Sequence, residues 1–283
     1  MPEDHFSRQP DRYAQARPRY PAALFAFLAD LAPATGAAWD CATGSGQAAI
    51  GLAERFDVVY ATDLSAAQIA QAAPHPRIRY AVAPAEACGL PDASVDAVTV
   101  ATAAHWLDLD RFYVEVRRVV RPGGVVALWS YYGNTIEPAL ESSAPQRLHR
   151  EILGSYWAPG NALAGVGYDP LPFPFDEVAW PGFEATTEWT VDDFLDYLRS
   201  WSAAQTYTAV HGSDPVDLVA DEIRAAWGDV RTRRARWDLF GRVGRVGGVG
   251  RADTAAVADV ADLVAVAAVA EAADPTEPAD RDA

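Results

Sequence analysis

The feature that most constrains the fold is an alternation of short apolar runs with helical patterns between Pro21 and Tyr131. Parallel strands need a crossover connection, usually a helix, so this alternation predicts an α/β fold with a parallel sheet covered by helices. A helix over Asp110–Val120 should end at a turn over Arg121–Gly124, because Pro ends helices and Gly tolerates positive φ. The expected strands are 37–41, 58–63, 78–82, 95–101 and 125–131.

A second region begins after Tyr132, where aromatic residues and prolines become more frequent. We interpret residues 133–232 as a cap that contains helices over Val191–Ala204 and Pro215–Trp227. The alternating run Arg234–Val243 predicts a late strand. The expected core is a doubly wound, seven-stranded, mostly parallel sheet whose last strand pair includes this run.

The predicted domain spans residues 1–246. Residues 247–283 contain no aromatic side chain and are dominated by Ala, Val and Asp. We expect a weakly ordered tail, in which Thr254–Ala273 is the one stretch interpreted as a helix.

Charge and cysteine content exclude several classes of function. The chain has 23 basic and 39 acidic residues, a net charge of −16, which disfavours nucleic acid and anionic membranes as partners. Cys41 and Cys88 are far apart, so neither a disulfide framework nor a metal site is predicted. The polar amino-terminal sequence has no signal-peptide pattern, and no apolar run has membrane-spanning length. These features predict a soluble cytoplasmic protein.

The most informative motif is the stretch Trp39–Gln47, in which Asp40 precedes a glycine-rich turn into a helix. Gly44 and Gly46 would let a ligand approach the backbone closely. The same letters fit a dinucleotide-binding fingerprint or an ordinary tight turn, so the motif alone is ambiguous.

Asp63 closes the second predicted strand, where a carboxylate can accept hydrogen bonds from both hydroxyls of an adenosine ribose. Both S-adenosylmethionine and a nicotinamide dinucleotide contain that ribose. The alternative role of Asp63 is to cap the helix that begins near Ser65. Asp40 favours S-adenosylmethionine, because an acid beside the turn suits an ammonium group and opposes a pyrophosphate.

Together these motifs resemble the class I S-adenosylmethionine-dependent methyltransferases, and within them the trans-aconitate methyltransferase-like, type 11 branch of small-molecule enzymes. The resemblance covers about His5–Val246. It rests on separated motifs in order: Phe6, Tyr13 and Arg17–Pro21; Asp40–Gly46; Ala61–Ser65 with Gln68; Ala85, Glu86 and Leu90–Asp96; Ala104–Trp106; and Arg118–Gly124.

The resemblance implies a role for each matching residue. It places Asp40 near the methionine ammonium group, Asp63 on the ribose and Leu64 on the adenine. The other implied cofactor contacts are Ala42, Gly44, Gly46, Gln68, Ala85, Glu86, Tyr13 and Arg17. Ala42 replaces the first glycine of the family loop, and Pro84 replaces an Asp that caps the adenine in many relatives. The alternative role of Glu86 is that of a solvent-exposed carboxylate at the start of a helix, without a contact to the cofactor.

His105 and Trp106 follow the fourth predicted strand, where the crevice at a topological switch point opens. We take both as candidate active-site residues, with His105 as a base for a hydroxyl acceptor and Trp106 as a pocket wall. The alternatives are a structural histidine and a core tryptophan. A carboxylate acceptor would instead need an arginine, for which Arg17, Arg19 and Arg199 are candidates.

Six aromatic residues are candidates for an apolar lid, each with ordinary packing as its alternative. They are Tyr131, Tyr132, Trp157, Trp180, Trp201 and Tyr207. The expected function is methyl transfer from S-adenosylmethionine to a carboxylate or hydroxyl oxygen of a small molecule. The alternatives are a cofactor-binding module without turnover and a dinucleotide-dependent oxidoreductase, which the Asp40, His-Trp and Pro-Gly-Gly motifs disfavour.

Overall fold

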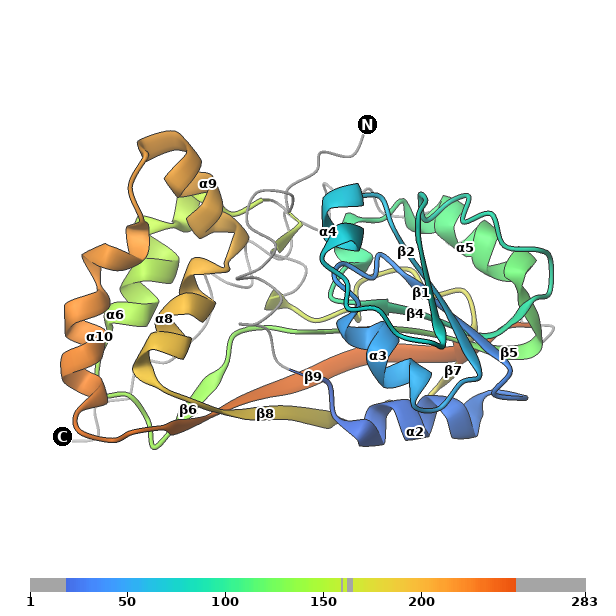
Figure 1. The fold of residues 1–283 in the computed structure, drawn as a ribbon, viewed down its shortest axis with the longest axis horizontal. Coiled ribbons are helices and arrows are strands. Elements are labelled where there is room, and N and C mark those ends of the chain that lie inside the picture. Colours follow the sequence, from blue (N-terminus) through green and yellow to red (C-terminus); the bar gives the residue numbers. More distant parts are fainter. Residues whose placement is uncertain (1–18, 159, 162–164, 248–283) are drawn as a thin grey trace, which may run out of the picture.

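A twisted, mostly parallel sheet forms the centre of the computed structural model, which describes residues 19–158, 160–161 and 165–247 (Figure 1). Neighbouring strands up to β5 are parallel and β9 runs antiparallel to β5, which confirms the predicted sheet. The order is β3 (Ile78–Val82), β2 (Val58–Asp63), β1 (Ala37–Cys41), β4 (Val95–Ala101), β5 (Val120–Tyr131) and β9 (Arg233–Arg245). None of the helices in these ranges is long and apolar enough to cross a membrane.

The long strand β9 organises the far side of the sheet. β5 and then β6 (Thr135–Glu137) pair along one of its edges. β7 (Asp176–Val178) and β8 (Phe183–Trp189) pair along the other. The described sheet therefore has nine strands rather than the expected seven. β5 and β6 follow one another along one edge of β9, and β7 and β8 follow one another along the other edge. Each of these two pairs fills one position, so the nine strands occupy the predicted seven positions across the sheet.

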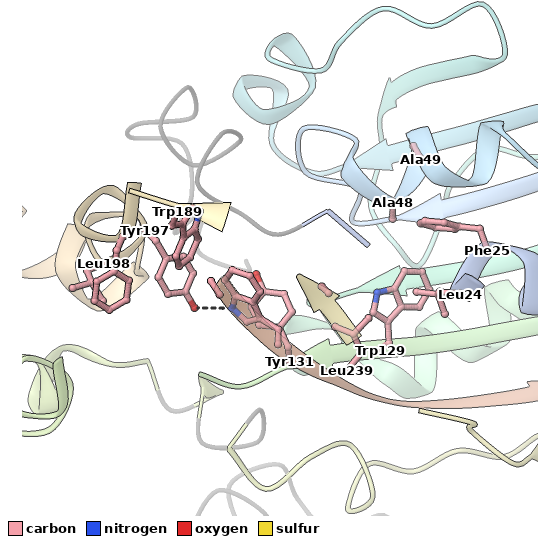
Figure 2. Packing of buried hydrophobic residues seen from close by; sticks show 14 of the residues in the cluster. Leu24, Phe25, Ala48, Ala49, Trp129, Tyr131, Trp189, Tyr197, Leu198 and Leu239 are labelled. Atoms are coloured by element: carbon pink, nitrogen blue, oxygen red, sulfur yellow. Dashed lines mark hydrogen bonds between the residues drawn. The ribbon is translucent and has the colours of Figure 1, made fainter. Parts of the chain in front are cut away.

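Helices cover both faces of the parallel part. α2 (Ala22–Leu31) and α3 (Gln47–Ala53) pack on one face, and α5 (Leu109–Val119) packs on the other. Figure 2 shows Phe25 of α2 lying near Ala48 and Ala49 of α3. A Cβ at Gly51 would overlap the Phe25 ring, so the glycine allows the two helices to approach. The short α4 (Ala66–Ala70) contacts β2 and β3.

The cap helices gather at the other end of the molecule (Figure 1). They are α6 (Ala144–Arg147), the π-helical turn η2 (Leu148–Ile152), the 3-10 turn η3 (Gly154–Tyr156), α8 (Val191–Arg199), α9 (Ser202–His211), the 3-10 turn η4 (Pro215–Leu218) and α10 (Ala220–Trp227). Trp189 joins them to β9, since its ring lies 4.8 Å from Trp237 and 5.0 Å from Tyr197. The Trp237 indole donates to the Tyr197 hydroxyl (Figure 2).

Several predicted boundaries were wrong. The expected helix 191–204 is broken at Trp201, whose backbone is extended and whose ring packs against Trp157 and Tyr197. The expected helix 215–227 is a 3-10 turn followed by α10.

Two further parts of the predicted architecture also differ from the structure. The turn expected over 121–124 is an irregular start of β5, where Val246 exchanges backbone hydrogen bonds with Gly123 and Gly124. Within the segment interpreted as a cap, β7 and β8 extend the sheet. The predicted tail from 248 onward lies outside the described residues.

Candidate functional site

The turn after β1 has a left-handed backbone at three positions. Gly44 has φ 58° and Gly46 has φ 92°, values that favour glycine. A Cβ at Gly46 would also collide with the Tyr80 hydroxyl, which leaves no room for a side chain there. Ala42, in place of the family's first glycine, has φ 54° and carries the steric strain of a left-handed alanine. The backbone that the motif predicts is therefore present, at a cost in stability at Ala42.

Asp63 at the end of β2 closes this turn. Its carboxylate accepts a hydrogen bond from the Gly44 amide at 2.8 Å and another from the Ser65 amide at 2.8 Å. Ser65, rather than Asp63, provides the side-chain cap of α4 by accepting from the Gln68 amide. A carboxylate oxygen accepts more than one hydrogen bond, so Asp63 retains acceptor capacity for ribose hydroxyls.

Asp40 lies beneath the turn and is completely buried. The hydroxyls of Thr43 and Thr99 donate to its two oxygens, at 2.7 Å for Thr99. Burial raises the pKa of Asp40 to about 6, and the nearby Asp63 charge adds to this. The expected contact of Asp40 with an ammonium group stays a prediction, because the structure places the carboxylate under the turn and out of contact with solvent.

Apolar side chains lie exposed beside this turn. Leu64 after β2 is 51% exposed and Val82 of β3 is 55% exposed, which is unusual for large aliphatic residues and suits a planar ring laid over them. Ala85 and Glu86 follow β3 and are half-buried. Gln68 is buried on α4. The structure therefore brings the residues predicted for adenosine to one edge of the sheet.

An ion pair that the sequence analysis missed holds the segment after β3. Glu115 of α5 accepts from the Cys88 amide at 2.8 Å and pairs with Arg118 at 2.7 Å. Arg118 also donates to the Leu90 carbonyl. The hydrogen bonds from Arg118 lower the pKa of Glu115 to about 2. Glu115 has no local sequence signal, because it follows Cys88 by 27 residues and resembles any helix-surface acid.

His105 and Trp106 lie in a 3-10 turn, η1 (Ala104–Trp106), directly after β4. Their rings are 4.8 Å apart, and His105 Nδ1 lies 3.0 Å from the Tyr168 hydroxyl. Tyr168 is a second residue that sequence reasoning missed. Thr102 precedes this turn with φ 56°, an unfavourable backbone for a β-branched residue. This strained turn follows the carboxyl end of β4, which pairs in parallel with β1 up to Cys41 and Val100.

The predicted covering segment reaches this turn through Tyr20. The Tyr20 hydroxyl lies 3.0 Å from Thr102 Oγ1, and its ring packs edge-on against Trp129. Tyr13 and Arg17 lie outside the described residues, so their cofactor contacts stay predictions.

The predicted lid aromatics do not form one group. Trp157 packs with His149 and Trp201 in the cap, and Tyr207 packs beside His211. Tyr132 contacts the same His149 and so lies beside Trp157 and Trp201. Trp180 packs apart from them with Phe27 and Phe183, and Tyr131 is buried.

Arg199 pairs with three carboxylates within the cap, which argues against its predicted role on an acceptor. No cluster of metal-ligating side chains occurs in the described part of the chain.

Comparison with known proteins gives consistent matches. A family model described as a methyltransferase domain matches residues 39–128. An uncharacterized methyltransferase of Mycobacterium tuberculosis is 38% identical over 209 residues, which cover 73% of this chain and 80% of that protein. A solved structure of a "putative type II methyltransferase" from Anaeromyxobacter dehalogenans is 48% identical, with a TM-score of 0.74 over 81% of this chain and 97% of that one.

Proposed function

Because the chain belongs to the class I S-adenosylmethionine-dependent methyltransferases, we propose that it transfers the methyl group of S-adenosylmethionine to an oxygen atom of a small molecule. The observation that carries this proposal is the hydrogen bond from Gly44 to Asp63, which joins the glycine-rich turn to the carboxylate that we assign to the ribose. The trans-aconitate-like branch is part of the proposal.

The residues present fit S-adenosylmethionine. Gly44 leaves its backbone open, since the nearest atom to a Cβ there would be Gln68 Oε1 at 3.9 Å, and Leu64 offers an exposed apolar surface beside Asp63. The buried Ser45 hydroxyl in the turn has no hydrogen-bond partner among the described residues. Buried polar groups are normally satisfied, so an unpaired hydroxyl in this turn supports a polar ligand there.

When bound, S-adenosylmethionine supplies a methyl group on a sulfonium that is already activated as a leaving group. The chain then has to align an acceptor and exclude water, and alignment alone corresponds to roughly 7–11 kcal/mol of barrier. Tyr20, which contacts Thr102, and Trp106, which ends the η1 turn, can exclude water after β4. His105 beside Trp106 contributes the polar group of this wall.

The proposed acceptor is a small molecule with a carboxylate or hydroxyl oxygen. A net charge of −16 supports neither nucleic acid nor an anionic membrane as a partner. We further propose a cytoplasmic location, supported by the absence of a Cys pairing pattern in the sequence.

Calorimetry with S-adenosylhomocysteine and NAD tests the cofactor, and labelled S-adenosylmethionine with a panel of small carboxylic acids and phenols tests turnover. We expect tight binding of S-adenosylhomocysteine, no binding of NAD, and one class of methylated product. Trp106→Ala should then lower kcat/KM for the acceptor by about 10-fold or more while cofactor affinity changes little. Preferential NAD binding would overturn the proposal, and cofactor binding without product would favour a module that lacks turnover.

A further inference from the structure

Tyr168 carries a buried hydroxyl that the proposed chemistry has not yet used. The residue is 1% exposed and lies 63 positions from His105 in sequence, yet its hydroxyl is 3.0 Å from His105 Nδ1. Because a neutral imidazole has one N–H donor and one acceptor nitrogen, the direction of this hydrogen bond decides which nitrogen bears the proton.

The burial of the Tyr168 hydroxyl indicates that direction. Among the described residues, His105 Nδ1 is the polar atom within hydrogen-bond distance of this hydroxyl, and bulk water does not reach a residue that is 1% exposed. A proton on Nδ1 would leave the phenol O–H buried without an acceptor, which is costly. Nδ1 therefore accepts and Tyr168 donates.

Burial keeps the phenol protonated, because it raises the pKa of Tyr168 well above its usual value. Ser130 carries another buried hydroxyl, which donates to the Tyr131 carbonyl at 3.4 Å. Removing that hydroxyl in Ser130→Ala therefore provides a separate test.

We propose that Tyr168 is a positioning residue that holds the neutral His105 ring with its proton on Nε2, so that His105 donates a hydrogen bond to the acceptor and does not act as a general base. The tautomer of His105 is inferred from the structure alone, whereas its consequence for the acceptor rests on the proposed function. A site without a base at His105 suits an acceptor that arrives as an anion, and we therefore assign a carboxylate as the acceptor group.

The step balances without a proton transfer. A lone pair of the carboxylate oxygen forms the new O–C bond to the methyl carbon, the C–S bond breaks, and its electron pair stays on sulfur. The negative charge of the acceptor and the positive charge of the sulfonium are both neutralised. An N–H donor from His105 would orient the carboxylate before transfer.

The direct test is ¹⁵N NMR of histidine-labelled protein without any ligand, with the His105 signals assigned by their loss in His105→Gln. We expect the Nε2–H tautomer in the wild type and in Ser130→Ala. Tyr168→Phe should redistribute the proton between the two nitrogens. Tyr113→Phe is the matched control, because Tyr113 is also buried in the same cluster and donates to the Pro172 carbonyl. An Nδ1–H tautomer in the wild type would overturn the proposal. So would a change of tautomer in Ser130→Ala that does not occur in Tyr168→Phe.

Steady-state kinetics with the acceptor that the protein methylates test whether His105 acts as a hydrogen-bond donor or as a base. Glutamine places an amide N–H near the position of Nε2 but cannot take a proton, so His105→Gln should keep kcat/KM within about 10-fold of the wild type while His105→Ala loses about 10- to 100-fold. Equal, large losses in both variants with a hydroxyl acceptor would show that His105 is a base. Wild-type protein that binds no S-adenosylhomocysteine would contradict the proposed function, while the NMR result would still decide the tautomer.

Discussion

The Gly44 amide donates a hydrogen bond to the Asp63 carboxylate at 2.8 Å, which joins the turn after β1 to the end of β2 before any ligand is bound. The other Asp63 oxygen accepts from the Ser65 amide. Asp63 thus holds the shape of the turn and also presents the carboxylate that we assign to the ribose. Loss of this side chain should affect binding through both roles.

Asp63→Ala should weaken S-adenosylhomocysteine binding by roughly 1.5–3 kcal/mol, the usual contribution of hydrogen bonds to a charged acceptor. Calorimetry at fixed salt measures this change. Asp57→Ala is the control, since Asp57 is an exposed acid just before β2. Unchanged affinity in Asp63→Ala would remove Asp63 from the proposed ribose site.

Ala42→Gly should stabilise the protein. The left-handed backbone at φ 54° costs an alanine about 1 kcal/mol, which glycine does not incur. A gain of this size corresponds to a rise in Tm of about 2–4 °C for a domain of this size. Ala29→Gly in the interior of α2 should instead lose ~0.5–1 kcal/mol. Losses in both variants would show that the strain at Ala42 has no energetic consequence.

Asp40→Asn should change the pH dependence of stability. The pKa of Asp40 is raised from 3.8 to about 6, so the folded protein binds this proton more tightly than the unfolded chain does. The stability of the wild type therefore falls as the pH rises through this interval, by up to about 3 kcal/mol. Asparagine has no such titration, so the Tm of Asp40→Asn should exceed that of the wild type at pH 7.5 more than at pH 4.

The same variant should bind S-adenosylmethionine more weakly, because the negative charge beneath the turn favours a cationic ligand. Calorimetry at pH 7.5 measures this second effect. A variant that is less stable at pH 7.5 and binds as well as the wild type would contradict both roles assigned to Asp40.

Glu115→Gln and Glu115→Ala separate the two contacts of Glu115. Glutamine keeps an acceptor for the Cys88 amide and loses the charge paired with Arg118, whereas alanine loses both. We expect losses of about 1–3 kcal/mol in unfolding free energy, larger for alanine, together with weaker adenosine binding. Urea unfolding and calorimetry measure them, and Glu188→Gln, at an exposed site on β8, is the control.

The pH dependence has the opposite sign to that of Asp40. Because the folded pKa of Glu115 is lowered from 4.5 to about 2, its contribution is present above pH 4.5 and is lost as the pH falls toward 2. Glu115→Gln should therefore reduce the stability difference between pH 7 and pH 3. The same acid sensitivity in the variant and the wild type would assign that sensitivity to other carboxylates.

The sequence by itself determined the parallel half of the fold and the turn that we assign to the cofactor. Strands 37–41, 58–63, 78–82 and 95–101 were predicted with the bounds that the structure shows, because a short run of strand-forming residues between turn residues is encoded locally. The left-handed turn was predictable for the same reason, since its backbone depends on glycines within a few residues of one another.

The tertiary structure alone decided the contacts between distant residues. Tyr168 contacts His105, which is 63 residues away in sequence, and Glu115 contacts Cys88, which is 27 residues away. No local sequence pattern around Tyr168 or Glu115 indicates these contacts. The break between α8 and α9 and the placement of β7 and β8 on β9 likewise depend on which side chains meet in space. Local patterns specify backbone conformation, whereas the direction of a hydrogen bond such as that of Tyr168 depends on every donor and acceptor that folding brings around it.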